Sequence, residues 1–114
     1  MACLTIPHPG FAKMGGMARQ KLTDAELRTA LDQLSGWAIA DNKLHREYKF
    51  PDFAHAFGFM ATAAVLIDKM NHHPEWSNVY NRVTVDLTTH DSGGITQNDV
   101  ELARVLEKIA GKLA

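Results

Sequence analysis

The spacing of apolar residues switches twice along the chain, from helical intervals to alternation and back again. Helical spacing begins after Thr23, where Glu26 completes a capping box three residues later, and Gly36 can end this first helix. A second helix is predicted from Asp52, a candidate N-cap, to about residue 70, and a third follows Thr96. We therefore expect three helices separated by segments of a different kind.

The segments between the predicted helices have the pattern of strands. Apolar and polar residues alternate in residues 37–50 around the turn signal Asp41-Asn42, which predicts a hairpin. They alternate again in residues 77–87, where a tight turn near Asn81 predicts a second hairpin. The order α-β-β-α-β-β-α predicts a single α+β domain, in which a four-stranded antiparallel sheet has its helices packed on one face.

The second predicted helix is rich in large apolar residues. Phe53, Phe57, Met60, Ala64 and Ile67 recur at helical intervals. Because such residues are usually buried, we expect them to form the packed face of the helix and not an aromatic cofactor site.

Length and charge exclude several classes of protein. The 114 residues fit one domain, and a formal net charge of -1 argues against binding to nucleic acid through a basic face. No run of about 18 apolar residues is apparent, so we expect no membrane-spanning segment.

The N-terminal segment differs from the rest of the chain. Residues 1–20 contain prolines and glycines but no periodic apolar pattern, so we expect a loosely packed leader there and one domain over residues 21–114. The segment also lacks the basic start and long apolar stretch of a signal peptide. Cys3 is the only cysteine, so an internal disulfide is impossible and a cytoplasmic location is expected.

Two adjacent histidines, His72 and His73, stand where the second predicted helix must end before Pro74. At a helix terminus both rings can line one cleft from different directions. Asp68 lies four residues before His72, so its carboxylate is expected to reach that imidazole and fix its tautomer. Alternatively, the two rings only cap the last carbonyl groups of the helix.

A second polar cluster follows the last predicted strand. Thr89 and His90 lie directly before the glycine pair 93–94, a favourable place for residues at the rim of a site. The alternative for His90 is a solvated loop histidine. His45 and His55 have no polar company within their elements, and we expect each to be exposed or to make one hydrogen bond.

The two clusters together resemble a known family. Segments 71–81 (NHHPEWSNVYN), 85–90 (VDLTTH) and 94–99 (GITQND) look like the signature of the pterin-4a-carbinolamine dehydratases, and the resemblance covers residues 21–113. A His-His-Pro triplet alone would be weak evidence. The whole first segment, a third histidine at matching distance and the Thr-to-Asp helix start make the resemblance specific.

The resemblance implies a reaction and a set of residues. Members of the family convert 4a-hydroxytetrahydropterin to quinonoid dihydropterin and water, which regenerates the cofactor used by aromatic amino-acid hydroxylases. The positions that match the catalytic histidines are His72, His73 and His90. The expected substrate-binding residues are Asp68, Asn71, Pro74, Trp76, Thr89 and Asp99. The chain departs from several relatives at Asp68, where they have Glu, and from some at Asn71, where they have Asp.

Imidazoles suit such a dehydration. One group must protonate the departing 4a-hydroxyl and another must take the proton from N5, and histidine can do both near neutrality. Trp76 can supply a flat apolar wall for the pterin ring. We therefore expect an enzyme that acts on a small pterin, uses no cofactor or metal ion, and binds neither nucleic acid nor membrane.

Two other functions stay open. The three histidines could formally supply three zinc ligands, although adjacent histidines rarely point at one ion. Some relatives act as dimerisation partners of a transcription factor or as assembly factors, so the alternative to an enzyme is a non-catalytic protein-binding module on the same fold. The resemblance also implies a homo-oligomer, a dimer or a tetramer, and leaves room for a protein partner.

Overall fold

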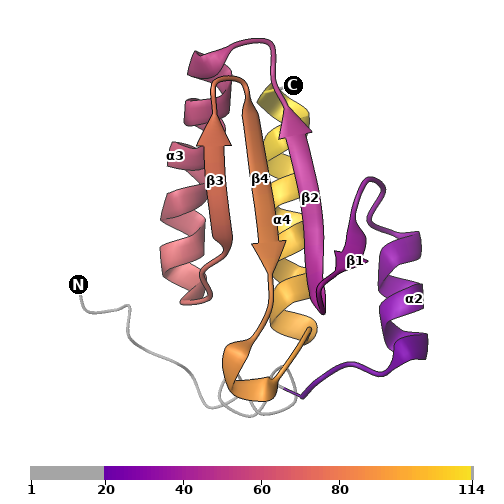
Figure 1. Ribbon diagram of the computed structural model, residues 1–114. Coiled ribbons are helices and arrows are strands. Elements are labelled where there is room, and N and C mark those ends of the chain that lie inside the picture. Colours follow the sequence, from indigo (N-terminus) through magenta and orange to yellow (C-terminus); the bar gives the residue numbers. More distant parts are fainter. Residues whose placement is uncertain (1–19, 114) are drawn as a thin grey trace.

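A computed structural model describes residues 20–113, in which helices cover one face of a four-stranded antiparallel sheet (Figure 1). The elements are α2 (Asp24–Asp32), β1 (Ala38–Ala40), β2 (Lys43–Lys49), α3 (Phe53–Met70), β3 (Glu75–Val79), β4 (Arg82–Leu87), the 3-10 helix η2 (His90–Ser92) and α4 (Gln97–Leu113). This order confirms the predicted α+β fold. The predicted leader, residues 1–20, lies outside the described residues except for its last residue.

The first helix begins as its capping box predicts. The Glu26 N–H donates to Thr23 Oγ1 at 3.2 Å, and the Thr23 N–H donates back to Glu26 Oε1 at 2.8 Å. After α2 the chain turns at Gly36, whose φ of +89° is one that side chains disfavour. A Cβ atom at Gly36 would also lie 2.6 Å from the guanidinium carbon of Arg46.

The two hairpins meet in the middle of the sheet. The strand order is β1-β2-β4-β3, and the central pair β2–β4 aligns Leu44 with Leu87. Asp41 and Asn42, between β1 and β2, both have positive φ, at 58° and 61°, as the tightest hairpin turns require. The predicted turn residues therefore fix the register of the first hairpin.

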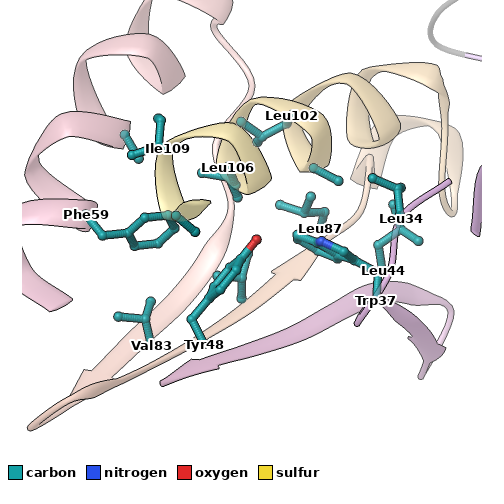
Figure 2. Close-up of a cluster of buried hydrophobic side chains, with 14 of the residues drawn as sticks. Leu34, Trp37, Leu44, Tyr48, Phe59, Val83, Leu87, Leu102, Leu106 and Ile109 are labelled. Carbon is teal, nitrogen blue, oxygen red and sulfur yellow. The ribbon is translucent and has the colours of Figure 1, made fainter. Parts of the chain in front are cut away.

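One face of the sheet supplies half of the core. Leu44, Val83, Val85 and Leu87 are fully buried, as the alternation in the sequence predicts. Figure 2 shows these strands meeting Phe59 of α3 and the leucines of α4. The other face of the sheet carries mainly polar side chains, among them His45, Thr84 and Asp86, and no helix within residues 20–113 covers it (Figure 1).

The prediction of which α3 residues face the core is wrong in part. Phe53 and Phe57 are 48% and 56% exposed, and Ala64 is also exposed. The buried residues of α3 are Ala56, Phe59, Ala63 and Ile67. Because the helix is apolar on nearly every side, the spacing of large residues did not distinguish the inner face from the outer one.

Helix α3, with 18 residues, is also long and apolar enough to cross a membrane by length and composition alone. This criterion is one of length and composition alone, so the expectation of no membrane-spanning segment stays a prediction. The inner side of α3 packs on the sheet and on α4, as the core helix of a globular domain does.

A single carboxylate joins α4 to the first hairpin. Glu107 Oε2 accepts hydrogen bonds from Trp37 Nε1 at 2.8 Å, Arg46 Nε at 3.1 Å and the Tyr48 hydroxyl at 2.5 Å. Arg46, which interrupts the apolar pattern of β2, is thereby paired, and its guanidinium lies 4.3 Å from the centre of the Tyr48 ring.

Candidate active site

Five elements bring their ends together at one end of the sheet. Helix α3 ends there, β3 begins, β4 ends, and η2 and the start of α4 follow (lower part of Figure 1). Asn71 ends α3 with a left-handed φ of 54°, and its N–H donates to the carbonyl of Asp68. The sharp turn at Asn71 separates the directions in which the next two residues, His72 and His73, point.

His72 turns inward to a buried carboxylate. Its Nε2 lies 2.5 Å from Asp99 Oδ1, with the His72 side chain 14% exposed and that of Asp99 fully buried. Asp99 Oδ2 accepts from the backbone N–H of Thr96 and from the Thr89 hydroxyl, both at 2.8 Å. Both oxygens of Asp99 are therefore occupied, and the carboxylate holds η2, the start of α4 and His72 in one arrangement.

His73 turns the other way, toward Asp68. Its Nε2 lies 3.5 Å from Asp68 Oδ1, and both side chains are exposed. The prediction that Asp68 would reach His72 is therefore wrong. The four-residue spacing assumes a continuous helix, whereas α3 ends at Met70 and the left-handed Asn71 rotates the following residues.

A groove of about 680 Å³ lies beside His73, within the size range of small-molecule sites. Its lining consists of Ala64, Val65, Ile67, Asp68, His73, Pro74 and Trp76. Trp76 packs edge-on against Phe59, with ring centres 6.5 Å apart, which holds the indole in place. The groove thus brings together four of the predicted site residues, while His72 and His90 are not among those that line it.

His90 begins η2 and pairs with a residue that sequence reasoning missed. Its Nε2 lies 2.9 Å from Glu75 Oε2, and Glu75 Oε1 accepts from Lys43 Nζ at 2.6 Å. The hydrogen bond from Lys43 holds the pKa of Glu75 below its ordinary value, against the opposing effect of burial. The available signal was the position of Glu75, directly after His73 and Pro74.

The predicted residues Thr89 and Asn71 take structural places. Thr89 is buried, and its hydroxyl lies 2.7 Å from that of Thr96 behind the carboxylate of Asp99. Asn71 caps α3 through its backbone. Thr89 therefore holds the carboxylate of Asp99 in place, and Asn71 sets the direction of the chain before His72.

Each candidate histidine therefore has its own carboxylate, and in each case Nε2 makes the contact. For His72 and His90, whose contacts are 2.5 and 2.9 Å long, a carboxylate that accepts from Nε2–H fixes the tautomer and leaves Nδ1 with the lone pair. His45 and His55 differ, since they contact Asp86 and Asp52 through Nδ1, each with one side-chain partner as expected.

Within residues 20–113, no three His, Cys, Asp or Glu side chains are grouped in a way that could hold a metal ion. The three candidate histidines are instead distributed over three separate carboxylates. What this arrangement offers is proton donors and acceptors of fixed orientation.

Known proteins share this sequence and fold. The family model for pterin 4 alpha carbinolamine dehydratase matches residues 20–109. A Solibacter usitatus protein described as a pterin-4-alpha-carbinolamine dehydratase is 59% identical over 90 residues, which cover 79% of this chain and 95% of that protein. A Brucella ovis protein with the same description is 50% identical over 97 residues, covering 83% of this chain and all of that protein.

A solved structure agrees in fold. The crystal structure of a transcriptional coactivator/pterin dehydratase from Brucella melitensis superposes with a TM-score of 0.79 at 48% identity, covering 81% of this chain and all of that one. The family match over most of the chain, the identity of the relatives and this superposition agree with one another. The chain belongs to the pterin-4a-carbinolamine dehydratase family.

Proposed function

We propose that this protein dehydrates a 4a-hydroxytetrahydropterin to a quinonoid dihydropterin, with histidine side chains as general acid and base. The family to which the chain belongs supports the dehydration, and the candidate site supports the histidines. The observation that carries the proposal is the pairing of His72 with Asp99, a nearly buried imidazole 2.5 Å from a fully buried carboxylate that two other donors hold in place.

The reaction needs two proton transfers. One protonated imidazole gives its proton to the 4a-hydroxyl, the C4a–O bond breaks, and water leaves. A neutral imidazole takes the proton from N5, and the electrons of the N5–H bond form the C4a=N5 double bond. The protein thus gains one proton and loses one, and positioned transfers of this kind contribute about 10²–10⁴-fold to the rate.

The groove beside His73 suits a flat, polar ring system. Trp76 and Pro74 offer an apolar wall, and Asp68 offers an acceptor for the amino and ring N–H groups of a pterin. His73 shares this groove, so we assign it to substrate binding as much as to proton transfer. His72 and His90 are the main candidates for acid and base.

The test replaces histidines singly and measures turnover of chemically made 4a-hydroxytetrahydropterin. His72→Ala and His90→Ala should each lower kcat by about 10²-fold or more while changing KM little, because the acid and base act mainly in the transition state. His45→Ala and His55→Ala are matched controls and should keep kcat. If both site variants fold and keep near wild-type kcat, the mechanism is wrong and a protein-binding module becomes the better function.

We also propose that the outer face of α3 pairs with a second copy of the chain. Phe53 and Phe57 are 48% and 56% exposed, and the helix carries no Lys, Arg, Asp or Glu before Asp68. An uncharged apolar face can pair with itself about a twofold axis without leaving a charge unpaired.

Light scattering tests this pairing. The wild type should have at least the mass of a dimer at micromolar concentration, and Phe57→Asp should lower the mass. Lys49→Asp, at an exposed position of β2, is the control and should not. A monomeric wild type would contradict the proposal.

A further inference from the structure

A chain of three side chains crosses the helix-free face of the sheet and ends at His90. Lys43 of β2 contacts Glu75 Oε1 at 2.6 Å, and Glu75 Oε2 contacts His90 Nε2 at 2.9 Å. Strand β4 lies between β2 and β3, so Lys43 reaches over it to Glu75. Each oxygen of this carboxylate therefore has its own partner.

We infer that Glu75 is a positioning residue for the reaction: held by Lys43, it fixes the His90 ring with Nε2–H toward the sheet and leaves Nδ1 for the substrate. The inference rests on the proposed function, in which His90 transfers a proton. It adds to that function that Nδ1 of His90 transfers the proton, and that Glu75 and Lys43 determine which nitrogen is available.

The direction of the hydrogen bond follows from the charge of Glu75. Its pKa lies below the ordinary value, chiefly because Lys43 donates to it, so the carboxylate is ionised near neutral pH and can only accept. The Nε2 atom of His90 must then carry a proton. In the neutral ring Nδ1 holds the lone pair, and in the charged ring Nδ1–H is the group left to donate.

The backbone around Glu75 is set by the sheet. Glu75 is the first residue of β3 and pairs in register with Asp86 of β4, so two carboxylates stand side by side on the same face. Like charges opposite each other are unfavourable. Lys43 neutralises Glu75, and His45 contacts Asp86 at 2.8 Å. Because Lys43 contacts only Oε1 of Glu75, Oε2 is available to accept from His90.

The contact contributes little to folding. His90 is 75% exposed and Glu75 is 43% exposed, and ion pairs in water add little to stability. Loss of Glu75 should therefore release the ring without unfolding the protein. The neighbouring pair of His45 and Asp86 lies on the same face, with side chains 38% and 30% exposed, and its histidine has no part in the proposed chemistry.

The experiment compares Glu75→Gln with Asp86→Asn in the full chain labelled with ¹⁵N-histidine. Imidazole ¹⁵N shifts at about pH 8.5, where histidine is usually neutral, report which nitrogen carries the proton. His90 should be the Nε2–H tautomer in the wild type and a mixture of tautomers in Glu75→Gln. Lys43→Gln should change His90 in the same direction by a smaller amount, and Asp86→Asn should leave it unchanged.

Kinetics complete the test. Glu75→Gln should lower kcat about tenfold with KM nearly unchanged, whereas Asp86→Asn should keep both. A wild-type His90 protonated on Nδ1 would overturn the inference, as would a Glu75→Gln protein with unchanged tautomer or unchanged kcat. A wild type without dehydratase activity would refute the proposed function instead, and the tautomers would still report whether Glu75 orients His90.

Discussion

Asp99→Asn changes one atom at the centre of the candidate site. The amide oxygen can take the place of Oδ2 and still accept from the Thr96 N–H and the Thr89 hydroxyl, both 2.8 Å from the carboxylate. The amide nitrogen then faces Nε2 of His72, which lies 2.5 Å from Oδ1. Because the amide can only donate there, the His72 ring must present a lone pair on Nε2 and carry its proton on Nδ1.

The magnitude follows from these contacts. Hydrogen bonds to a charged group contribute about 1.5–3 kcal/mol, against about 0.5–1.5 kcal/mol for neutral ones. The substitution weakens those at Asp99, but it also removes the cost of burying a charge. We expect a net loss of about 1–2 kcal/mol in the free energy of unfolding, which lowers Tm by about 5–15 °C and leaves the protein folded at 25 °C.

The effect on catalysis should be larger than the effect on stability. With Nδ1 protonated in the neutral ring, His72 presents the wrong group to the substrate, and kcat should fall by about 10²-fold. That fall corresponds to about 2.7 kcal/mol of transition-state stabilisation. The assays are thermal unfolding by circular dichroism, kcat and KM for the pterin, and the ¹⁵N shifts of His72. Asp86→Asn serves as the control.

A folded Asp99→Asn protein that keeps kcat within about threefold of wild type would refute this reasoning. An unchanged His72 tautomer would refute it as well. Either result would mean that Asp99 serves the fold alone and that His72 is not positioned through it.

Three further predictions concern the rest of the domain. Burial raises the pKa of Glu107, but hydrogen bonds, first from Tyr48, outweigh burial and hold this pKa below its ordinary 4.5. The ionised carboxylate therefore stabilises the fold above pH 4.5, and this stabilisation is lost as the pH falls. The difference in free energy of unfolding between wild type and Glu107→Gln, measured in urea, should become smaller in acid. Gly36→Ala should destabilise by about 1–3 kcal/mol in the same assay, and by less in an Arg46→Ala background, because the new methyl group displaces that guanidinium. Deleting residues 1–19 should leave kcat within about twofold, since the family match begins at residue 20.

Local signals in the sequence predicted most of the fold. The capping box of Thr23 and Glu26 and the turn at Asp41-Asn42 each depend on residues a few positions apart, and all appear as expected. The inner face of α3 was not predictable in this way. A helix that is apolar on nearly every side gives a weak periodic signal, and its inner face depends on what the rest of the chain packs against it.

In the candidate site, too, features that depend on neighbouring residues could be predicted and contacts between distant residues could not. The histidines could be found because they are adjacent in sequence or follow a strand end. The pairing of each histidine with its carboxylate could not be predicted: Asp99 was expected at the site, but it is 27 residues from His72 and meets it only in the folded chain. The predicted local pairing of Asp68 with His72 does not form, because Asn71 ends the helix between them.

The strand order β1-β2-β4-β3 also bears on how the protein acquires its activity as it folds. Each hairpin can form early, because its two strands are neighbours in sequence. The pairing of β2 with β4 is slower, because α3 lies between them in sequence and the loop that contains it must close first. The carboxylate partners of His72 and His90 come from α4 and β3, on either side of β4 in sequence. The candidate site residues all lie between residues 68 and 99, but an intermediate with only its hairpins formed lacks the contact of His72 with Asp99, because the start of α4 is not yet in place. Catalysis and complete folding should appear together in this protein, with no partly active stage between them.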